Sequence, residues 1–252
     1  IRDRLYGPMI FREISGWDTT VNVHNMGSLS KTWVRVKFLD ASGGSVLSLS
    51  DWVCAQGSTT FYLPISTDLG VDYVGAVTIE SLEREGSAPQ PISAIVNMGK
   101  PDHPHTPLDA QGASYNAIPQ SLVENVRAIA LPFLAKGEIT SSVGIRNNSH
   151  CNRLAAILDI YDSTGLLASV PISIGPEKVE YVAMDNIGVS LFTGSGILRV
   201  SVDEILCGEE VPGANIPMPS VIVVNTGIGA GAGDIMSAYE GIVAAIATSH
   251  LL

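Results

Sequence analysis

The chain contains 252 residues, of which 46% are hydrophobic and 15% are charged, so it can form one large or two ordinary cores and is not intrinsically disordered. Its net charge of −11 excludes a protein that binds nucleic-acid phosphates through a basic face. The same charge argues against an anionic membrane surface, and no run of about 18 apolar residues predicts a membrane-spanning helix.

The first third of the chain predicts a series of short strands. An apolar entry begins at Pro8, which suits an edge strand because proline cannot donate to a ladder. Alternation from Val34 to Phe38 predicts a strand whose apolar residues face a core while Arg35 and Lys37 face water. The predicted strands, separated by Gly, Ser, Asn, Asp or Pro, are Trp17–Asn25, Thr32–Leu39, Val46–Val53, Thr59–Leu63, Tyr73–Glu80 and Ile92–Asn97.

The second half of the chain repeats this pattern. Val21-Asn22-Val23-His24-Asn25 returns as Val143-Gly144-Ile145-Arg146-Asn147, and the turn Asp40–Gly43 returns as Asp162–Gly165; both offsets are 122, since 147 − 25 = 165 − 43 = 122. An internal repeat of about half the length predicts two similar domains. The second copy's predicted strands are Ser142–Asn147, Ala156–Tyr161, Leu167–Ile174, Val179–Ala183, Ile197–Val202 and Val221–Asn225.

Later matches extend the repeat towards the end of each copy. Thr60–Tyr62 is matched with Val179–Tyr181, and Pro91–Asn97 with Pro219–Asn225. No helical period separates the strands, so we predict an all-β fold of antiparallel β-sandwiches rather than a βαβ sheet. Each copy has a proline in its entry strand and a tyrosine near its end: Pro8 and Tyr115 in the first, Pro132 and Tyr239 in the second.

The predicted domains are residues 1–118 and 132–252, joined by an apolar connector and first-strand entry at 119–131. The second domain ends in an apolar tail, in which Val243–Ala247 resembles Val126–Ala130 of the connector. If the connector joins the first domain to the second, a similar tail could join the second domain to a neighbouring molecule.

The three cysteines allow two interpretations. They are Cys54, Cys151 and Cys207, and none belongs to a CxxC pair. All three can be buried thiols, since free cysteine behaves as a small hydrophobe. Alternatively, Cys151 and Cys207, which both fall in polar loops of the second copy, form a disulfide and Cys54 stays unpaired; such a bridge would place the protein outside the reducing cytosol.

The polar clusters predict no catalytic or metal chemistry. Asp102, His103, His105 and Asp109 could bind a metal ion, but the surrounding prolines favour an extended, solvated loop. The glycines of 227–233 lack the lysine of a phosphate-binding loop and predict a flexible loop between the last two strands. No Gly-x-Ser-x-Gly nucleophile elbow occurs. We therefore predict no cofactor and no enzymatic activity.

Two further surface features have ordinary explanations. Asn147-Asn148-Ser149 matches the glycosylation acceptor pattern, which chance also explains. Trp17, Trp33 and Trp52 all lie in the first copy and could form a platform for sugars, although Trp33 sits on an alternating strand and is expected in the core.

With its repeat blocks and closing tyrosines, the chain resembles the tandem immunoglobulin-like β-sandwich modules of bacterial cell-surface and secreted structural proteins. The resemblance implies an extracellular, non-enzymatic structural or adhesive role. Our leading prediction is a subunit of an extracellular filament, pilus-like fibre or surface layer that binds copies of itself head to tail, with terminal-strand donation as one route. The alternative is a cell-surface adhesin that recognises glycans or proteins. The predicted assembly residues are Leu5, Met9 and Phe11 at the N-terminus and Ile242, Val243, Ile246 and Leu251 at the C-terminus.

Overall fold

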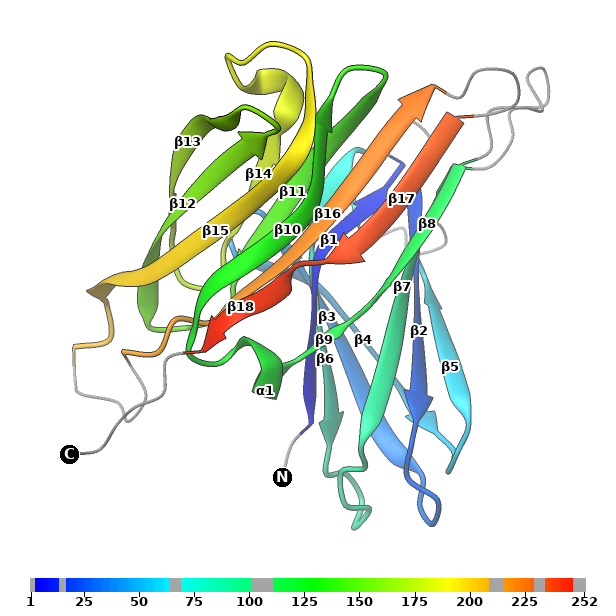
Figure 1. Cartoon of the computed structure of the whole chain (residues 1–252). Coiled ribbons are helices and arrows are strands. Elements are labelled where there is room, and N and C mark those ends of the chain that lie inside the picture. Colours follow the sequence, from blue (N-terminus) through cyan, green and yellow to red (C-terminus); the bar gives the residue numbers. More distant parts are fainter. Residues whose placement is uncertain are drawn as a thin grey trace.

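The computed structural model describes residues 3–13, 17–63, 69–100, 111–208, 215–228 and 234–246. Within these ranges the chain is almost entirely β, with one short helix, α1 (Gln120–Val123), and one 3-10 turn, η2 (Met184–Asn186). All strand pairs are antiparallel, as predicted. Eighteen strands form four sheets in the described residues, and two layers of sheets surround each of two hydrophobic cores (Figure 1).

The first half of the chain forms two sheets. One has the order β4-β3-β6-β1-β9 and the other β5-β2-β7-β8. These strands are β1 (Arg4–Arg12), β2 (Asp18–Asn25), β3 (Thr32–Asp40), β4 (Ser45–Val53), β5 (Ser58–Tyr62), β6 (Tyr73–Leu82), β7 (Ile92–Lys100), β8 (Gln111–Asn116) and β9 (Ile118–Pro119).

The second half has the same strand order with nine added to each number. Its sheets are β13-β12-β15-β10-β18 and β14-β11-β16-β17. The strands are β10 (Val126–Lys136), β11 (Ile139–Asn147), β12 (Asn152–Asp162), β13 (Gly165–Ile174), β14 (Val179–Ala183), β15 (Phe192–Ile205), β16 (Pro219–Ile228), β17 (Asp234–Glu240) and β18 (Ile242–Ile246).

Each half keeps its alternating apolar residues between its own sheets. Val34, Val36 and Phe38 of β3 are fully buried in the first core, as the alternation predicted. Val143 and Ile145 of β11 take the same role in the second core. Because the strand period is two, the residues between them point to the outer faces of the sheets.

The strand order differs from that of an immunoglobulin constant domain. There the first strand lies beside the second and the seventh beside the sixth. Here β1 lies beside β6, and β7 lies beside β2. The alternation predicted where strands occur, but it holds no information on which strands pair, because every core-facing strand shows the same period.

Both entry strands contain a bulge at their proline. The β1–β6 register shifts between Gly7 and Ile10, and the β10–β15 register shifts between Leu131 and Leu134. A bulge tolerates proline because one residue is left out of the ladder. In each half a tyrosine hydroxyl donates a hydrogen bond to the bulge: Tyr115 Oη to the Met9 carbonyl and Tyr239 Oη to the Phe133 carbonyl. The closing tyrosines therefore hold the bulges in place.

The ladders correct two of the sequence matches. Val21 pairs with Val96, whereas the corresponding Val143 pairs with Val223, so Pro91–Asn97 and Pro219–Asn225 are offset by one residue from the match drawn by sequence. Thr60 occupies the place of Tyr181, two residues from the predicted match. A one-residue shift exchanges the two faces of a strand, so Asn97 lies on an outer face while Asn225 is buried.

The predicted connector and first-strand entry at 119–131 contains α1 and the start of β10, which begins at Val126. The likeness between Val126–Ala130 and Val243–Ala247 does not mark equivalent segments, because β18 is the neighbour of β10 in one sheet. The strand that corresponds to β18 is β9: Ile118 pairs with Tyr6, as Ile242 pairs with Ala130.

Candidate functional site

The two halves of the chain meet across a buried interface. The outer face of sheet β14-β11-β16-β17 packs on the outer face of the first half, around β1 and β6, and Ile222 and Val224 of β16 belong to the first hydrophobic core. In Figure 1, β16 crosses β1 while β17 and β8 run side by side. We call this contact the inter-half interface.

Arg146 lies at the centre of the inter-half interface. Its side chain is 1% exposed, and its guanidinium donates hydrogen bonds to the Val77 carbonyl at 2.8 Å and to Thr78 Oγ1 at 2.7 Å. The guanidinium carbon also lies 5.1 Å from the ring centroid of Tyr6. Burial lowers the pKa of Arg146 to about 10, because the charged form has lost its water. The group remains charged at neutral pH and fixes the second half against β6.

A tyrosine and a glycine complete the contact. Tyr181 Oη donates a hydrogen bond to the Gly75 carbonyl at 2.8 Å. Gly144 permits close approach, since an added Cβ would lie 2.9 Å from Met9 Cε and 3.3 Å from Met9 Cβ. At the edge of the interface, the backbone N–H of Asn116 donates to the Glu240 carboxylate. Apolar burial and directed hydrogen bonds thus join the two halves at this interface.

The structure places the N-terminal assembly residues inside the molecule. Leu5 and Met9 are each 2% exposed and lie in the first core, and Phe11 packs against it. Because β1 is hydrogen-bonded to both β6 and β9, it is not a free terminal strand. Met9 does lie at an interface, but the partner is the second half of the same chain.

The C-terminal assembly residues lie on the edge strand β18. Ile242 and Val243 are 58% and 37% exposed. Ile246 pairs with Val126, and Leu251 lies outside the described residues. β18 is therefore already hydrogen-bonded to β10, and only its outer edge and its faces are available.

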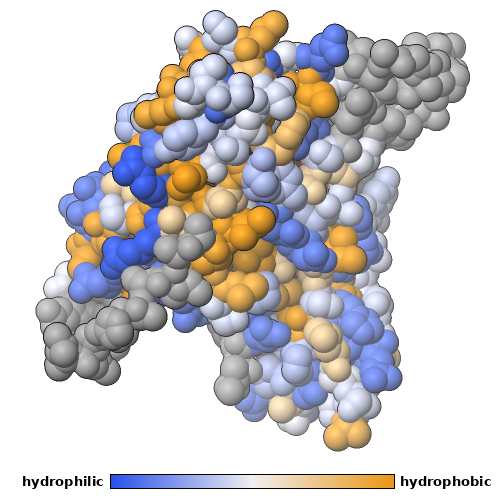
Figure 2. Space-filling view, in the orientation of Figure 1, coloured by the Kyte–Doolittle hydropathy of each residue, from blue (hydrophilic) through white to orange (hydrophobic). Residues whose placement is uncertain are grey.

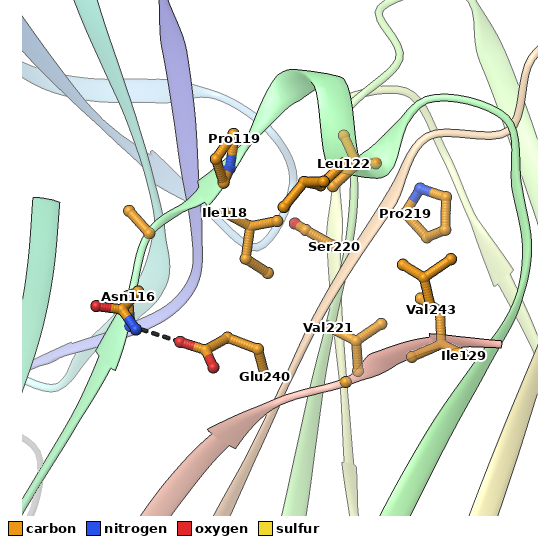
Figure 3. Close-up of a pocket in the computed structure, with 13 residues that line it drawn as sticks. Asn116, Ile118, Pro119, Leu122, Ile129, Pro219, Ser220, Val221, Glu240 and Val243 are labelled. Atoms are coloured by element: carbon orange, nitrogen blue, oxygen red, sulfur yellow. Dashed lines mark hydrogen bonds between the residues drawn. The ribbon is translucent and has the colours of Figure 1, made fainter. Parts of the chain in front are cut away.

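An apolar cavity of about 410 Å³ lies beside β18 (Figure 3). The connector covers one side with Ile118 and Leu122, and β16 and β18 supply Val221 and Val243. The carboxylate of Glu240 is the acidic group in the lining and accepts a hydrogen bond from the backbone N–H of Asn116. This lining offers shape and apolar surface, and its one hydroxyl, that of Ser220, donates to Asn148 Oδ1 at 3.5 Å.

The outer face of the first five-stranded sheet carries a buried carboxylate. Glu80 is 1% exposed and accepts hydrogen bonds from Arg4 and Arg35, with Lys37 Nζ 3.7 Å away. Burial alone would raise the pKa of Glu80, but the hydrogen bonds from Arg35 and Arg4 and the nearby cations outweigh it and lower this pKa to about 2. Arg35 and Lys37, predicted to face water, thus neutralise Glu80.

The tryptophan platform is partly formed and partly covered. Trp33 and Trp52 meet edge to face with ring centroids 5.2 Å apart. Trp33 lies on the outer face of β3, outside the buried cores, contrary to the prediction, because it alternates with core-facing Val34. Cations cover ring faces: Arg84 stands 3.7 Å from the Trp33 centroid and Lys31 4.0 Å from that of Trp52. Trp17 lies apart, in the lining of a cavity at the inter-half interface.

The second half leaves its own corresponding face open. Ala130 and Ile197 pair in the ladder as Tyr6 and Thr78 do, but Ile197 is 39% exposed while Thr78 is 7% exposed. Phe133 is half-buried, whereas Met9 at the corresponding bulge is 2% exposed. Figure 2 shows hydrophobic residues gathered over β18 and the adjoining parts of β10 and β15. We call this surface the open face.

Two features of the loop after β11 bear on the compartment. Cys151 and Cys207 are joined by a disulfide that ties this loop to the end of β15, and Cys54 is an exposed free thiol. Asn147, in the acceptor pattern, is fully buried, and its amide donates to the Asn152 and Gly175 carbonyls. A folded chain therefore cannot present Asn147 to a glycosylating enzyme.

The metal candidates Asp102, His103, His105 and Asp109 lie outside the described residues, as does the centre of the glycine-rich loop between β16 and β17. Among the residues that the structure describes, no group of three or more His, Cys, Asp or Glu side chains is placed to hold a metal ion. No helix in those same ranges has the length and apolar character needed to cross a membrane.

No protein-family model matches the chain, and no curated protein matches it. A solved structure described as an "anti-sigma factor domain-containing protein" aligns over 92% of this chain and 81% of its own, with 10% sequence identity and a TM-score of 0.21. A TM-score this low carries no argument about fold or function.

Proposed function

We propose that the protein is a structural subunit of an extracellular filament, pilus-like fibre or surface layer, built from two tandem β-sandwich modules that resemble immunoglobulin-like modules in their two layers but not in their strand order. It binds copies of itself head to tail and is not an enzyme. One observation carries the proposal: the inter-half interface joins two corresponding units through two different faces. The first unit contributes the outer face of its five-stranded sheet, and the second that of its four-stranded sheet.

A contact of this kind is heterologous. When a heterologous contact repeats between identical units and the rotation does not close, it generates an open filament. Within the chain, the inter-half interface buries the outer face of one five-stranded sheet and of one four-stranded sheet. One face of each kind remains, at opposite halves of the molecule, so the chain offers the two surfaces that propagation needs.

Exchange of a terminal strand is a second route for the same assembly. β18 could leave β10 of its own chain and pair with β10 of a neighbour. This route first breaks a ladder of the folded subunit, whereas contact through the open face breaks none. We therefore favour face-to-face assembly.

The proposed compartment is extracellular. Disulfides persist in oxidising environments and are rare in the cytosol. The Cys151–Cys207 bridge supports secretion or display at the cell surface.

The alternative function is an adhesin that binds surface glycans or proteins. The Trp33–Trp52 pair, half-buried on an outer face, supports it, because aromatic rings stack on sugars. Lys31 and Arg84 occupy ring faces, however, and would have to move to admit a sugar.

The mass distribution of the native chain separates these functions. We expect mass to grow without a fixed limit as concentration rises at near-neutral pH, and electron microscopy to show filaments or sheets. A discrete monomer at every concentration would overturn the structural proposal. Saturable glycan binding that is lost in Trp52→Ala would then establish the adhesin.

A further inference from the structure

One outer surface of the first half collects cations and tryptophans. The residues between the core-facing valines of β3 point to the outer face of its sheet, and Trp52 of β4 lies opposite Trp33 in the ladder. Lys31 belongs to the same surface, because its ammonium lies 4.0 Å from the centre of the Trp52 ring. Arg84 belongs to it because its guanidinium lies 3.7 Å from the centre of the Trp33 ring. The basic-aromatic face, as we call it, consists of Lys31, Trp33, Arg35, Lys37, Trp52 and Arg84.

Positive charge gathers on this face although the whole chain carries a net charge of −11. With Arg4 of the same sheet beside it, the face holds five of the chain's 14 lysines and arginines. Four of these five cations keep 31–45% of the side chain exposed. Two carboxylates contact them, those of the buried Glu80 and the exposed Glu85. The cations exceed these carboxylates by 5 − 2 = 3, so the surface attracts anions.

The second half has the same strand order but not these side chains. The ladder positions that correspond to Trp33, Trp52, Arg35 and Lys37 are occupied by Ala155, Ser173, Ile157 and Asp159. Since both halves form the same sheet, the sheet requires neither the tryptophans nor the cations. A ligand explains this set of side chains better than the fold does.

We propose that the basic-aromatic face binds an acidic polysaccharide, whose carboxylates pair with the cations while its sugar rings pack on the indoles. The indole rings offer apolar surface to the C–H faces of a sugar, and their N–H groups donate to its hydroxyls. Lys31 and Arg84 leave the ring faces when a sugar enters, and an acidic sugar gives each of them a carboxylate in exchange. This inference goes beyond self-assembly, since one copy suffices, and it rests on the alternative function, to which it gives a ligand class.

A nucleic acid fits the molecule less well than an acidic polysaccharide does. The chain outside the face carries a net charge of −11 − 3 = −14, which repels a polymer with a phosphate at every nucleotide. A polysaccharide carries its carboxylates among neutral hydroxyls and meets less of this repulsion. The Cys151–Cys207 bridge also supports a location outside the cytosol.

Titration of three probes against the parent chain tests the ligand class. The probes are an oligogalacturonate, a neutral dextran and single-stranded DNA, followed by calorimetry at physiological salt. We expect saturable binding of the oligogalacturonate that weakens as salt rises, because salt screens partly exposed charges. Equal binding of dextran would show that the cations take no part, and equal binding of DNA would show a general anion surface. Either result, or no binding of the oligogalacturonate, would overturn the inference.

Matched variants test the location of the site. Lys31→Gln with Arg84→Gln removes two cations from the face, and Arg127→Gln with Arg153→Gln removes two exposed cations from the second half. Both double variants bring the net charge to −11 − 2 = −13. We expect the first to bind the oligogalacturonate about tenfold more weakly, as two lost exposed ion pairs predict, and the second to bind it as the parent does. Trp52→Ala, shown to be folded by circular dichroism, should weaken binding about fivefold. Equal binding by the two double variants would overturn the site.

Self-association is measured separately from glycan binding. If the chain stays monomeric at all concentrations while it binds the oligogalacturonate, the proposed structural function fails and this inference stands. If the chain polymerises but does not bind the oligogalacturonate, the inference fails alone.

Discussion

Glu80→Gln tests how strongly the charge cluster on the first five-stranded sheet stabilises the fold. The substitution keeps the size of the side chain but leaves Arg4, Arg35 and Lys37 without their shared anion. Lowering the pKa of Glu80 from 4.5 to about 2 is worth at most about 3 kcal/mol, at about 1.4 kcal/mol per pKa unit. The partly exposed cations are screened by water, so we expect a loss of about 2 kcal/mol at pH 7.

The pH dependence gives the sign of the effect. A carboxylate whose pKa is lower in the folded state contributes stability that is fully present above its unfolded pKa and disappears as pH falls through the folded value. The parent should therefore lose this contribution of Glu80 between about pH 4.5 and pH 2. Glu80→Gln should lack that part of the acid transition, so the two curves should converge near pH 2.

Urea unfolding at a series of pH values, followed by circular dichroism, measures both effects. Asp159→Asn is the matched control. Asp159 and Arg199 form the corresponding pair of the second half with charges exchanged, and the side chain of Arg199 is 59% exposed. We expect this control to lose less than about 1 kcal/mol. Equal losses for the two variants, or an unchanged acid transition in Glu80→Gln, would refute the reasoning.

Three further predictions concern the scaffold. Tyr115→Phe and Tyr239→Phe should each cost about 1–3 kcal/mol in urea unfolding, because each leaves a bulge carbonyl without its donor; neutral substitutions would show that the hydroxyls are dispensable. Treating the purified, folded chain with a glycosylating enzyme should yield no glycan on Asn147, and a glycan found there by mass spectrometry would contradict its burial. Removing the Cys151–Cys207 bridge should destabilise the chain by about 4 kcal/mol, the loop-closure value for a separation of 56 residues; equal unfolding midpoints with and without reductant would contradict this.

Local patterns predicted where the strands lie but not how they pair. Alternation located β3 and its buried residues because one face of that strand meets the core. β8 escaped prediction because its sequence is dominated by small residues and glycine, which show little alternation. β17 was predicted without bounds, as the strand that follows the glycine-rich loop. Which strands lie beside β1 depends on contacts between residues far apart in the sequence, and the residue pattern within one strand does not reveal them.

The candidate site was harder to predict, because its residues make their contacts with the other half of the chain. Arg146 looked like a substitution of His24 on a scaffold strand, yet it is a fully buried charge at the centre of the inter-half interface. Met9 was assigned to assembly for its apolar character and does form an interface, within the chain. Composition shows that a side chain prefers burial, but it does not identify the surface that buries it.

Differences between corresponding positions reveal the interface more directly than the similarities do. Ile222 and Val224 stand where the first half has Ile95 and Asn97, so the outer face of β16 is apolar at both of these positions while that of β7 is apolar at only one. A strand apolar on both faces loses its period of two, which is why the sequence match of β7 with β16 slipped by one residue. The slip is itself a sign of a second buried face: β16, which the sequence repeat misaligned by one residue, packs on the other half.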